Sequence, residues 1–318
     1  TFNVSFPTTT SPYNQDFCLT PNGIHYDLEV IVTRLKAQIP GTDVPYKIIF
    51  KNKGNQLQSG TITLNFDDAI MDFVSSNPAE TSISTNQLTW NYSNLNPFET
   101  REIEFVMNLN SPMETPALNS GDRIEFTGNI QPNSSGISDD YPEDNNISVN
   151  FDVVNSADPN DITCLEGNSV GPNLIGNYVH YMIRFENIGT ANAINVVVKN
   201  LIDATKFNVD TLIPLSSNYD FITRKKGNEF EFIFENINLP FDDANNDGYL
   251  VYKIKLRNIL TVGNTFTNQA NIFFDFNFPI VTNTESTTIE TLSNNAFEMA
   301  NLSISPNPTS NFINIQSE

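Results

Sequence analysis

Apolar and polar residues alternate along most of this chain with the two-residue period of a half-buried β-strand. Aromatic or branched residues alternate with Lys, Arg or Glu over residues 46–51, 102–107, 229–234 and 252–257. The segments between such runs are rich in Asn, Asp, Gly, Pro and Ser, which favour turns. The nearest approach to a helical stripe, residues 201–207, is long enough for one turn only. The pattern therefore predicts an all-β fold.

The chain contains an internal repeat. Its clearest pair is YKIIFKNKG (46–54) and YMIRFENIG (181–189), with five identities in nine residues. Two later pairs keep the same order: NQLTWNYSNL (86–95) with NEFEFIFENI (228–237), and GDRIEFTGNI (121–130) with GNTFTNQANI (263–272). The alignment places Trp90 opposite Phe232, so a shared core position is expected for both.

The repeat and the turn spacing predict two tandem immunoglobulin-like β-sandwiches of about seven strands each. The first spans residues 28–155 and the second residues 156–291. Residues 1–27 are interpreted as a lead-in or as the end of an upstream segment.

Charge excludes several classes of partner. The 318 residues carry a net charge of −21, from 16 Lys and Arg against 37 Asp and Glu. A field of this sign repels phosphate backbones, so nucleic acid is not expected as a partner. No run reaches the roughly 18 apolar residues of a membrane helix, so no direct membrane span is expected. The start, TFNVSFPTTT, lacks the features of a signal peptide, and residue 1 is interpreted as a cut in a longer chain.

The two cysteines leave three alternatives open. Cys18 precedes the first strand-like run, and Cys164 follows the segment between the two copies. If the copies stack end to end, the two Cα atoms are expected to lie beyond the roughly 7 Å that a disulfide spans. The alternatives are a Cys18–Cys164 disulfide, pairing of Cys18 with an upstream segment, and two free thiols.

Candidate catalytic groups are few. The two histidines are His25 and His180, and His180 alternates with its neighbours in a strand, which favours an outer-face or edge position. The sequence has no G-x-S-x-G, H-E-x-x-H or C-x-x-C motif and no phosphate-binding glycine loop. Acid pairs such as Asp67 and Asp68 are expected by chance in so acidic a chain. The sequence therefore predicts a protein that is not an enzyme.

Three acidic, Asn-rich loops are candidates for calcium, because clustered carboxylate and amide oxygens are the ligands that Ca²⁺ prefers. They are DDYPEDNN (139–146), DPND (158–161) and DANNDG (243–248). The third fits the first half of a calcium loop but has Ile254 where the twelfth-position acid is needed. The alternative is that these loops are solvated turns that keep strand edges from pairing. The predicted ligands, with no other cofactor expected, are Asp243, Asn245, Asp247, Asp158 and Asp161.

Several segments of the second copy resemble the immunoglobulin-like conserved-repeat module of secreted Bacteroidota proteins. They are YVHYMIRFENIGTANAINVVVKNLID (178–203), EFIFENINLPF (231–241), NDGYLVYKIKL (246–256) and NIFFDFNFPIVTN (271–283). VVNSADPNDITCLEG (153–167) resembles the lead-in of the same module. The module that precedes it in such proteins is resembled by two earlier segments, QDFCLTPNGIHYDLEVI (15–31) and PFETREIEFVMNLNSP (97–112).

The C-terminal segment LSISPNPTSNFINI (302–315) resembles the opening of a type A C-terminal sorting domain. Its signature turn is Pro306, Asn307 and Pro308, and the remainder of that domain, with its basic terminal segment, is missing from the sequence. The resemblance implies the first strands of a small β-sandwich over residues 301–318, joined by a linker over residues 292–300.

The resemblance implies a cargo of the type IX secretion system. Its partners would be the outer-membrane translocon and a shuttle protein, both acting through the sorting domain, and its localisation would be secreted or cell-surface. The sandwiches would be a stalk that separates an N-terminal functional domain from the C-terminal secretion signal of an adhesin or gliding-related protein. In many relatives the N-terminal domain consists of leucine-rich repeats. Asp210-Thr211-Leu212 resembles the short O-glycosylation motif of such exported proteins, with Thr211 as the acceptor.

A second function stays open: the sandwiches as carbohydrate-binding accessory modules of a secreted hydrolase. Such modules stack sugar rings on exposed aromatic side chains. An exposed row formed by Tyr92, Tyr141, Tyr219 and Tyr249 would favour this alternative, and scattered single tyrosines would favour the stalk.

Overall fold

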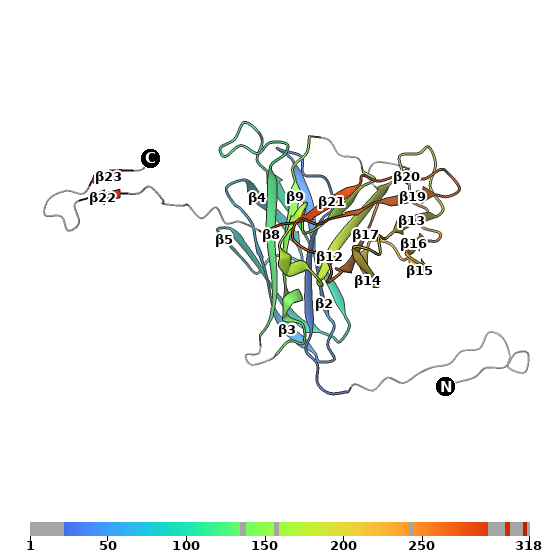
Figure 1. Ribbon diagram of the computed structural model, residues 1–318, viewed down its shortest axis with the longest axis horizontal. Helices are drawn as coiled ribbons and strands as arrows, with labels where there is room; N and C mark the ends of the chain where they lie inside the picture. Colours follow the sequence, from blue (N-terminus) through green and yellow to red (C-terminus); the bar gives the residue numbers. More distant parts are fainter. Residues whose placement is uncertain are drawn as a thin grey trace, which may run out of the picture. The chain divides into compact units, whose positions relative to one another are not determined.

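The computed structural model describes residues 22–133, 138–155, 159–241 and 245–291, together with the backbone of two short strands near the C-terminus (Figure 1). These residues are nearly all in strands and turns, with two single-turn 3-10 helices, η1 (Pro142–Asn145) and η2 (Pro172–Leu174). The predicted all-β class is confirmed. The chain divides into two compact units, residues 1–119 with 125–148, and residues 120–124 with 149–318.

The first unit is built around two sheets. The four-stranded sheet has the order β1-β2-β7-β4, formed by β1 (Leu28–Arg34), β2 (Asp43–Asn52), β7 (Thr100–Leu109) and β4 (Met71–Asn77). The five-stranded sheet has the order β5-β6-β3-β8-β9. Its strands are β5 (Ser82–Ser84), β6 (Gln87–Leu95), β3 (Gln58–Asn65), β8 (Arg123–Pro132) and β9 (Asn146–Asp152), and the residue bounds between the two units fall within β8 and β9.

The second unit repeats this plan. Its four-stranded sheet, β10-β12-β17-β14, contains β10 (Ile162–Cys164), β12 (Tyr178–Glu186), β17 (Asp247–Leu256) and β14 (Phe207–Ser217). The five-stranded sheet, β15-β16-β13-β19-β20, contains β15 (Ile222–Lys226), β16 (Glu229–Phe234), β13 (Val196–Leu201), β19 (Ala270–Phe274) and β20 (Ile280–Val281). A third sheet joins β11 (Ser169–Val170), β21 (Glu285–Ile289) and β18 (Thr265–Asn268).

The two main sheets of one unit correspond strand for strand to those of the other. The match extends to register, because Tyr46 faces Phe105 across β2 and β7 as Tyr181 faces Tyr252 across β12 and β17. Ile62 is paired with Trp90 as Val198 is paired with Phe232, which is the equivalence that the internal repeat predicts. The repeat in the sequence is therefore a repeat of strand pairing.

Aromatic side chains join the two sheets of each unit face to face. In the first unit the ring centroids of Tyr46 and Phe126 are 4.8 Å apart. In the second unit the rings of Phe185 and Phe234 are 5.1 Å apart. Trp90 is buried in the first core and Phe232 in the second, as their alignment predicts. These contacts combine large apolar burial with the tilted and edge-to-face geometries that aromatic pairs favour.

A buried asparagine, the last residue of β2 in the first unit and the residue after β12 in the second, explains part of the repeat. The Asn187 side chain donates to the carbonyls of Ala191 and Leu239 at 2.9 and 3.0 Å and accepts the Gly189 N–H at 3.0 Å. Asn52 makes the same three bonds in the first unit, to the carbonyls of Gln56 and Leu95 and from the Gly54 N–H. Because buried backbone groups need partners, one carboxamide fixes the turn in both copies.

One core layer differs between the units. Leu64, Phe105 and Phe126 occupy three register positions of the first core, and the second core has Asn200, Tyr252 and Asn268 there. The three polar side chains bond to one another: Tyr252 Oη donates to Asn200 Oδ1 at 2.8 Å, Asn200 Nδ2 to Asn268 Oδ1 at 2.7 Å, and Asn268 Nδ2 to Tyr252 Oη at 2.6 Å. This closed triangle satisfies groups that would be costly if buried alone.

Two short strands lie near the C-terminus. β22 (Ser303–Ser305) and β23 (Asn314–Gln316) pair antiparallel, with Ile304 opposite Ile315. The segments 292–302 and 306–313 lie outside the described residues, and with them the predicted linker and the turn Pro306, Asn307 and Pro308.

Candidate functional site

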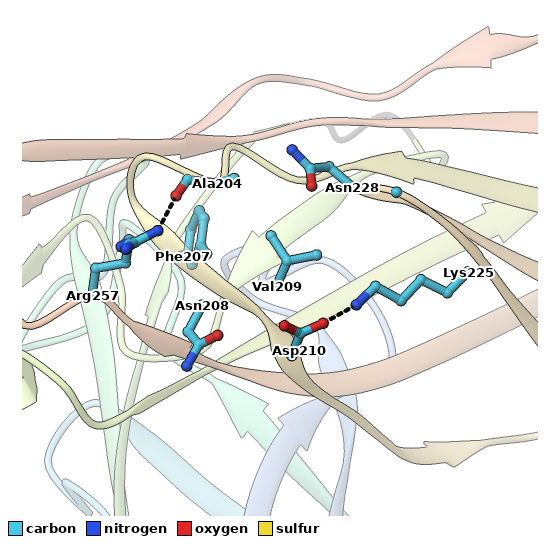
Figure 2. A pocket seen from close by; sticks show the side chains of 9 residues that line it. Ala204, Phe207, Asn208, Val209, Asp210, Lys225, Asn228 and Arg257 are labelled. Carbon is cyan, nitrogen blue, oxygen red and sulfur yellow. Dashed lines mark hydrogen bonds and ion pairs between the residues drawn. The ribbon is translucent and has the colours of Figure 1, made fainter.

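Two adjoining hollows flank the first half of the edge strand β14 in the second unit. One, of about 490 Å³, lies between β14 and the β15–β16 turn, and the other, of about 600 Å³, lies between β14 and the end of β17. They share Asn208, Asp210 and Arg257, and together form one groove, called the β14 groove below. Figure 2 shows the first hollow, with Asp210 and Lys225 pointing toward one another.

A bulge in β14 shapes this groove. The register of β14 against β17 shifts between Asn208 and Ile213, so the residues between them leave the regular ladder. Thr211 closes the bulge, because its hydroxyl donates to the Asn208 carbonyl at 2.6 Å and accepts the Lys255 N–H at 3.0 Å. This is the threonine predicted as a glycosylation acceptor. Attachment of a sugar removes the hydroxyl proton and with it the bond to Asn208.

In the lining of the second hollow, the Asn258 side chain packs closely against Gly176. Gly176 has a φ of +80°, and a Cβ at this position would lie 2.0 Å from Asn258 Oδ1. Only glycine meets both conditions without strain. This close packing therefore depends on the absence of a side chain at position 176.

Three cationic side chains line the groove, and each has a different kind of partner. Lys225 forms an ion pair with Asp210, and this hydrogen-bonded cation lowers the pKa of the Asp210 carboxyl. Arg257 donates from Nη1 to the Ala204 carbonyl at 2.9 Å, as Figure 2 shows. The Lys255 ammonium lies 4.9 Å from the centroid of the Tyr178 ring, a cation–π distance. The groove thus has more positive than negative side chains.

Three of the five residues predicted to bind calcium, Asp161, Asn245 and Asp247, lie in the described ranges. Asp158 and Asp243 lie outside the described residues. Both carboxylate oxygens of Asp161 bond to Arg184 at 2.7 Å in a bidentate pair, and Asn245 and Asp247 are exposed at the start of β17. Within the described ranges, no group of three His, Cys, Asp or Glu side chains has the geometry of a metal site. Comparing the melting temperature with calcium and with chelator would test this prediction.

The acidic loop at residues 139–146 contacts the chain just before β1. Asp139 accepts the Leu28 N–H at 2.9 Å, and the Tyr26 carbonyl accepts the Asp140 N–H at 2.8 Å. Lys53 forms ion pairs with Asp27 and Asp144 at 2.9 and 2.5 Å. Several acids of this loop are thus used to fix the start of the first unit.

His25 gives this contact a pH dependence. Its Nε2 donates to the Asn22 carbonyl and its Nδ1 to Asp140 Oδ2, both at 2.7 Å, which requires the protonated ring. These bonds raise the pKa of His25 above its ordinary value of 6.5. The stabilisation is therefore complete below pH 6.5 and is lost as pH rises through the raised pKa.

We expect the melting temperature of the first unit to fall between about pH 5 and pH 8, and to fall less in a His25→Gln variant. Circular dichroism melts at both values measure this difference, with the matched variant His180→Gln as the comparison. An identical pH dependence in wild type and His25→Gln would contradict the assignment.

A cluster of ionisable side chains that the sequence patterns did not reveal is formed by Cys164, Glu166 and His180. His180 Nδ1 lies 2.6 Å from Glu166 Oε1, and Cys164 Sγ lies 3.3 Å from Glu166 Oε2. Burial raises the pKa of the Cys164 thiol well above its usual range, which disfavours the thiolate that a nucleophile needs. Cys164 is a free, buried thiol, and Cys18 lies outside the described residues. The only feature of the sequence that could have indicated this cluster is the Cys-x-Glu spacing of Cys164 and Glu166.

The four tyrosines named for sugar stacking do not form a row. Tyr92 and Tyr249 are both 6% exposed, Tyr219 is half-buried and Tyr141 is 56% exposed. Among the described residues, the most exposed aromatic side chains are those of Phe276 and Phe278, in the turn between β19 and β20. No helix in the described ranges is long and apolar enough to cross a membrane.

Comparison with known proteins gives one family match. A family model described as "Domain of unknown function (DUF7619)" matches residues 158–288, which lie in the second unit. No curated protein matches the chain.

Several solved structures of bacterial surface proteins are similar at low level. The C-terminal domain of the Streptococcus pyogenes antigen I/II-family protein AspA has 8% identity and a TM-score of 0.30, covering 84% of this chain and 100% of that one. The collagen adhesin CNA of S. aureus has 14% identity and a TM-score of 0.28, covering 83% and 93%. The N-terminal domain of the Streptococcus gordonii adhesin Sgo0707 has 12% identity and a TM-score of 0.31, covering 78% of this chain and 60% of that one.

Proposed function

We propose that this chain is part of a non-enzymatic secreted or cell-surface protein exported by the type IX secretion system. Its two β-units act as a stalk between an N-terminal functional domain and the C-terminal sorting domain that begins at residue 301. The full-length protein is an adhesin or a gliding-related surface protein. Its partners in export are the translocon and the shuttle protein that recognise the sorting domain.

The stalk proposal rests on one observation: in the part of the chain that the structure describes, the two units share their scaffold but not a cluster of ionisable groups. They share a strand order, a register and the buried bonds of Asn52 and Asn187. Among the residues that the structure describes, the two units do not share a cluster of ionisable groups. The acids of 139–146 bond to the start of the first unit, and Glu166 bonds to Cys164 and His180 in the second. Repetition of a scaffold without repetition of a site is what a spacer requires.

Export is supported by the sequence at the C-terminus and by the residues around 178–203, 231–241, 246–256 and 271–283 that resemble the conserved-repeat module. The carbohydrate-module alternative has less support, because two of its four candidate tyrosines are buried.

Surface exposure tests the proposal directly. Protease added to intact cells that express the full-length gene product should digest the two units without permeabilisation of the outer membrane. A periplasmic protein of the same cells serves as the control and should stay intact. Protection of the units until the outer membrane is permeabilised would contradict a surface location.

A further inference from the structure

The positive charge of the β14 groove comes from its own lining residues. Between positions 199 and 257 the chain has nine Asp and Glu and half of its 16 Lys and Arg residues. The Lys and Arg residues are Lys199, Lys206, Arg224, Lys225, Lys226, Lys253, Lys255 and Arg257. Three of these line the groove, against the single carboxylate of Asp210. The groove is thus a positive site on an acidic molecule.

Two of the three lining cations are available to a ligand. In the part of the chain that the structure describes, neither Lys255 nor Arg257 lies within ion-pair distance of a carboxylate. Arg257 donates one N–H to the Ala204 carbonyl, which leaves most of its five donors for other acceptors. A guanidinium of this kind matches the two oxygens of a carboxylate or sulfate group.

The rest of the lining indicates the kind of molecule that would fit. The amides of Asn208, Asn228 and Asn258 offer both donors and acceptors, which suit hydroxyl groups. The one aromatic side chain of the lining, Phe207, is 1% exposed and presents no ring face. Stacking of a neutral sugar or a nucleobase therefore has no platform here.

We propose that the β14 groove binds the oxyanion groups of an acidic polysaccharide. Arg257 and Lys255 hold a carboxylate or sulfate group, and the three asparagine amides bond to the hydroxyls of neighbouring sugar rings. A nucleic acid fits less well, because the one aromatic ring of the lining is buried and no base could stack on it. Such a site would attach the protein to an acidic matrix, which its role as a stalk does not require.

Asp210 competes with the ligand for the same cations. It is largely exposed, it lines both hollows, and it is paired with Lys225. Its replacement by Asn removes one negative charge and releases Lys225. The Asp210→Asn variant should therefore bind an acidic glycan more tightly, although it loses an ion pair.

Calorimetric titration of the 318-residue chain at physiological ionic strength tests the site. The ligands are polygalacturonate, chondroitin sulfate, neutral dextran and duplex DNA. We expect binding to one or both acidic glycans, and the glycan that binds tells whether the group is a carboxylate or a sulfate. Each of Lys255→Gln and Arg257→Gln should weaken binding about tenfold, the effect of one charge-assisted bond.

Controls separate a specific site from general charge attraction. Lys36→Gln, which removes an exposed cation of the first unit, should leave the affinity unchanged, and all variants should keep the wild-type melting temperature. No binding to either acidic glycan, equal binding to dextran or DNA, or no loss in the Lys255→Gln/Arg257→Gln double variant would each overturn the proposal. Weaker binding by Asp210→Asn would overturn the role of Asp210.

Discussion

Asn187→Ala is expected to lower the free energy of unfolding by about 3 kcal/mol, from the three hydrogen bonds of this buried side chain at about 1 kcal/mol each. Asn187 is 5% exposed, and its loss leaves two carbonyls and the Gly189 N–H without their partner. Urea denaturation followed by circular dichroism measures the change.

The repeat supplies a matched variant. Asn52→Ala removes the equivalent three bonds from the first unit, which contains Trp90, the only tryptophan. Its effect should therefore appear in tryptophan fluorescence and be of similar size. Asn91→Ala, on the exposed side of β6, should change the stability by less than about 0.5 kcal/mol. A loss below about 1 kcal/mol in both Asn52→Ala and Asn187→Ala would contradict the role of the shared asparagine.

Tyr252→Phe should destabilise the protein by about 1–3 kcal/mol, although it removes a single oxygen atom. The Tyr252 hydroxyl donates to Asn200 and accepts from Asn268 inside a core where all three residues are buried. Without it, two buried amide groups each lose a partner. Urea denaturation by circular dichroism, with Tyr219→Phe as the comparison at a half-buried tyrosine, measures the loss.

A double-mutant cycle tests whether the three residues act as a unit. Asn268→Leu alone should also be destabilising, because it removes one partner of Asn200 and one of Tyr252. Combined with Tyr252→Phe it should cost less than the sum of the two, since each change removes a group that the other leaves unpaired. Strict additivity of the two changes would contradict a coupled triangle.

Much of the fold could be predicted because its determinants are local and repeated. Apolar and charged residues alternate over 46–51 and 229–234 with the side-chain period of the strands β2 and β16. The prediction that these strands are half-buried was wrong, because Lys47 and Glu231 are also buried. The Asn-x-Gly identity of the two copies, at 52–54 and 187–189, marks bonds that both units make. Identities between copies therefore pointed to residues with a structural task.

The parts that could not be predicted depend on distant partners. The acids at 139–146 looked like oxygen ligands, but Lys53, which pairs with Asp144, lies 91 positions away in the chain. The β14 groove forms where an edge strand bulges, and the bulge leaves no periodic signal around Thr211. Alternation also fails in the turn after β19, where Phe276 and Phe278 continue an apolar pattern yet are almost fully exposed.

The most direct measurement is the location of the full-length gene product after removal of everything from residue 301 onward. We expect this truncated product to be retained in the periplasm, because it lacks the segment that resembles a sorting domain. A matched deletion of residues 156–291, which keeps that segment and removes one unit of the stalk, should still be exported. Arrival of the truncated product at the cell surface or in the medium at the wild-type level would contradict the proposed export route.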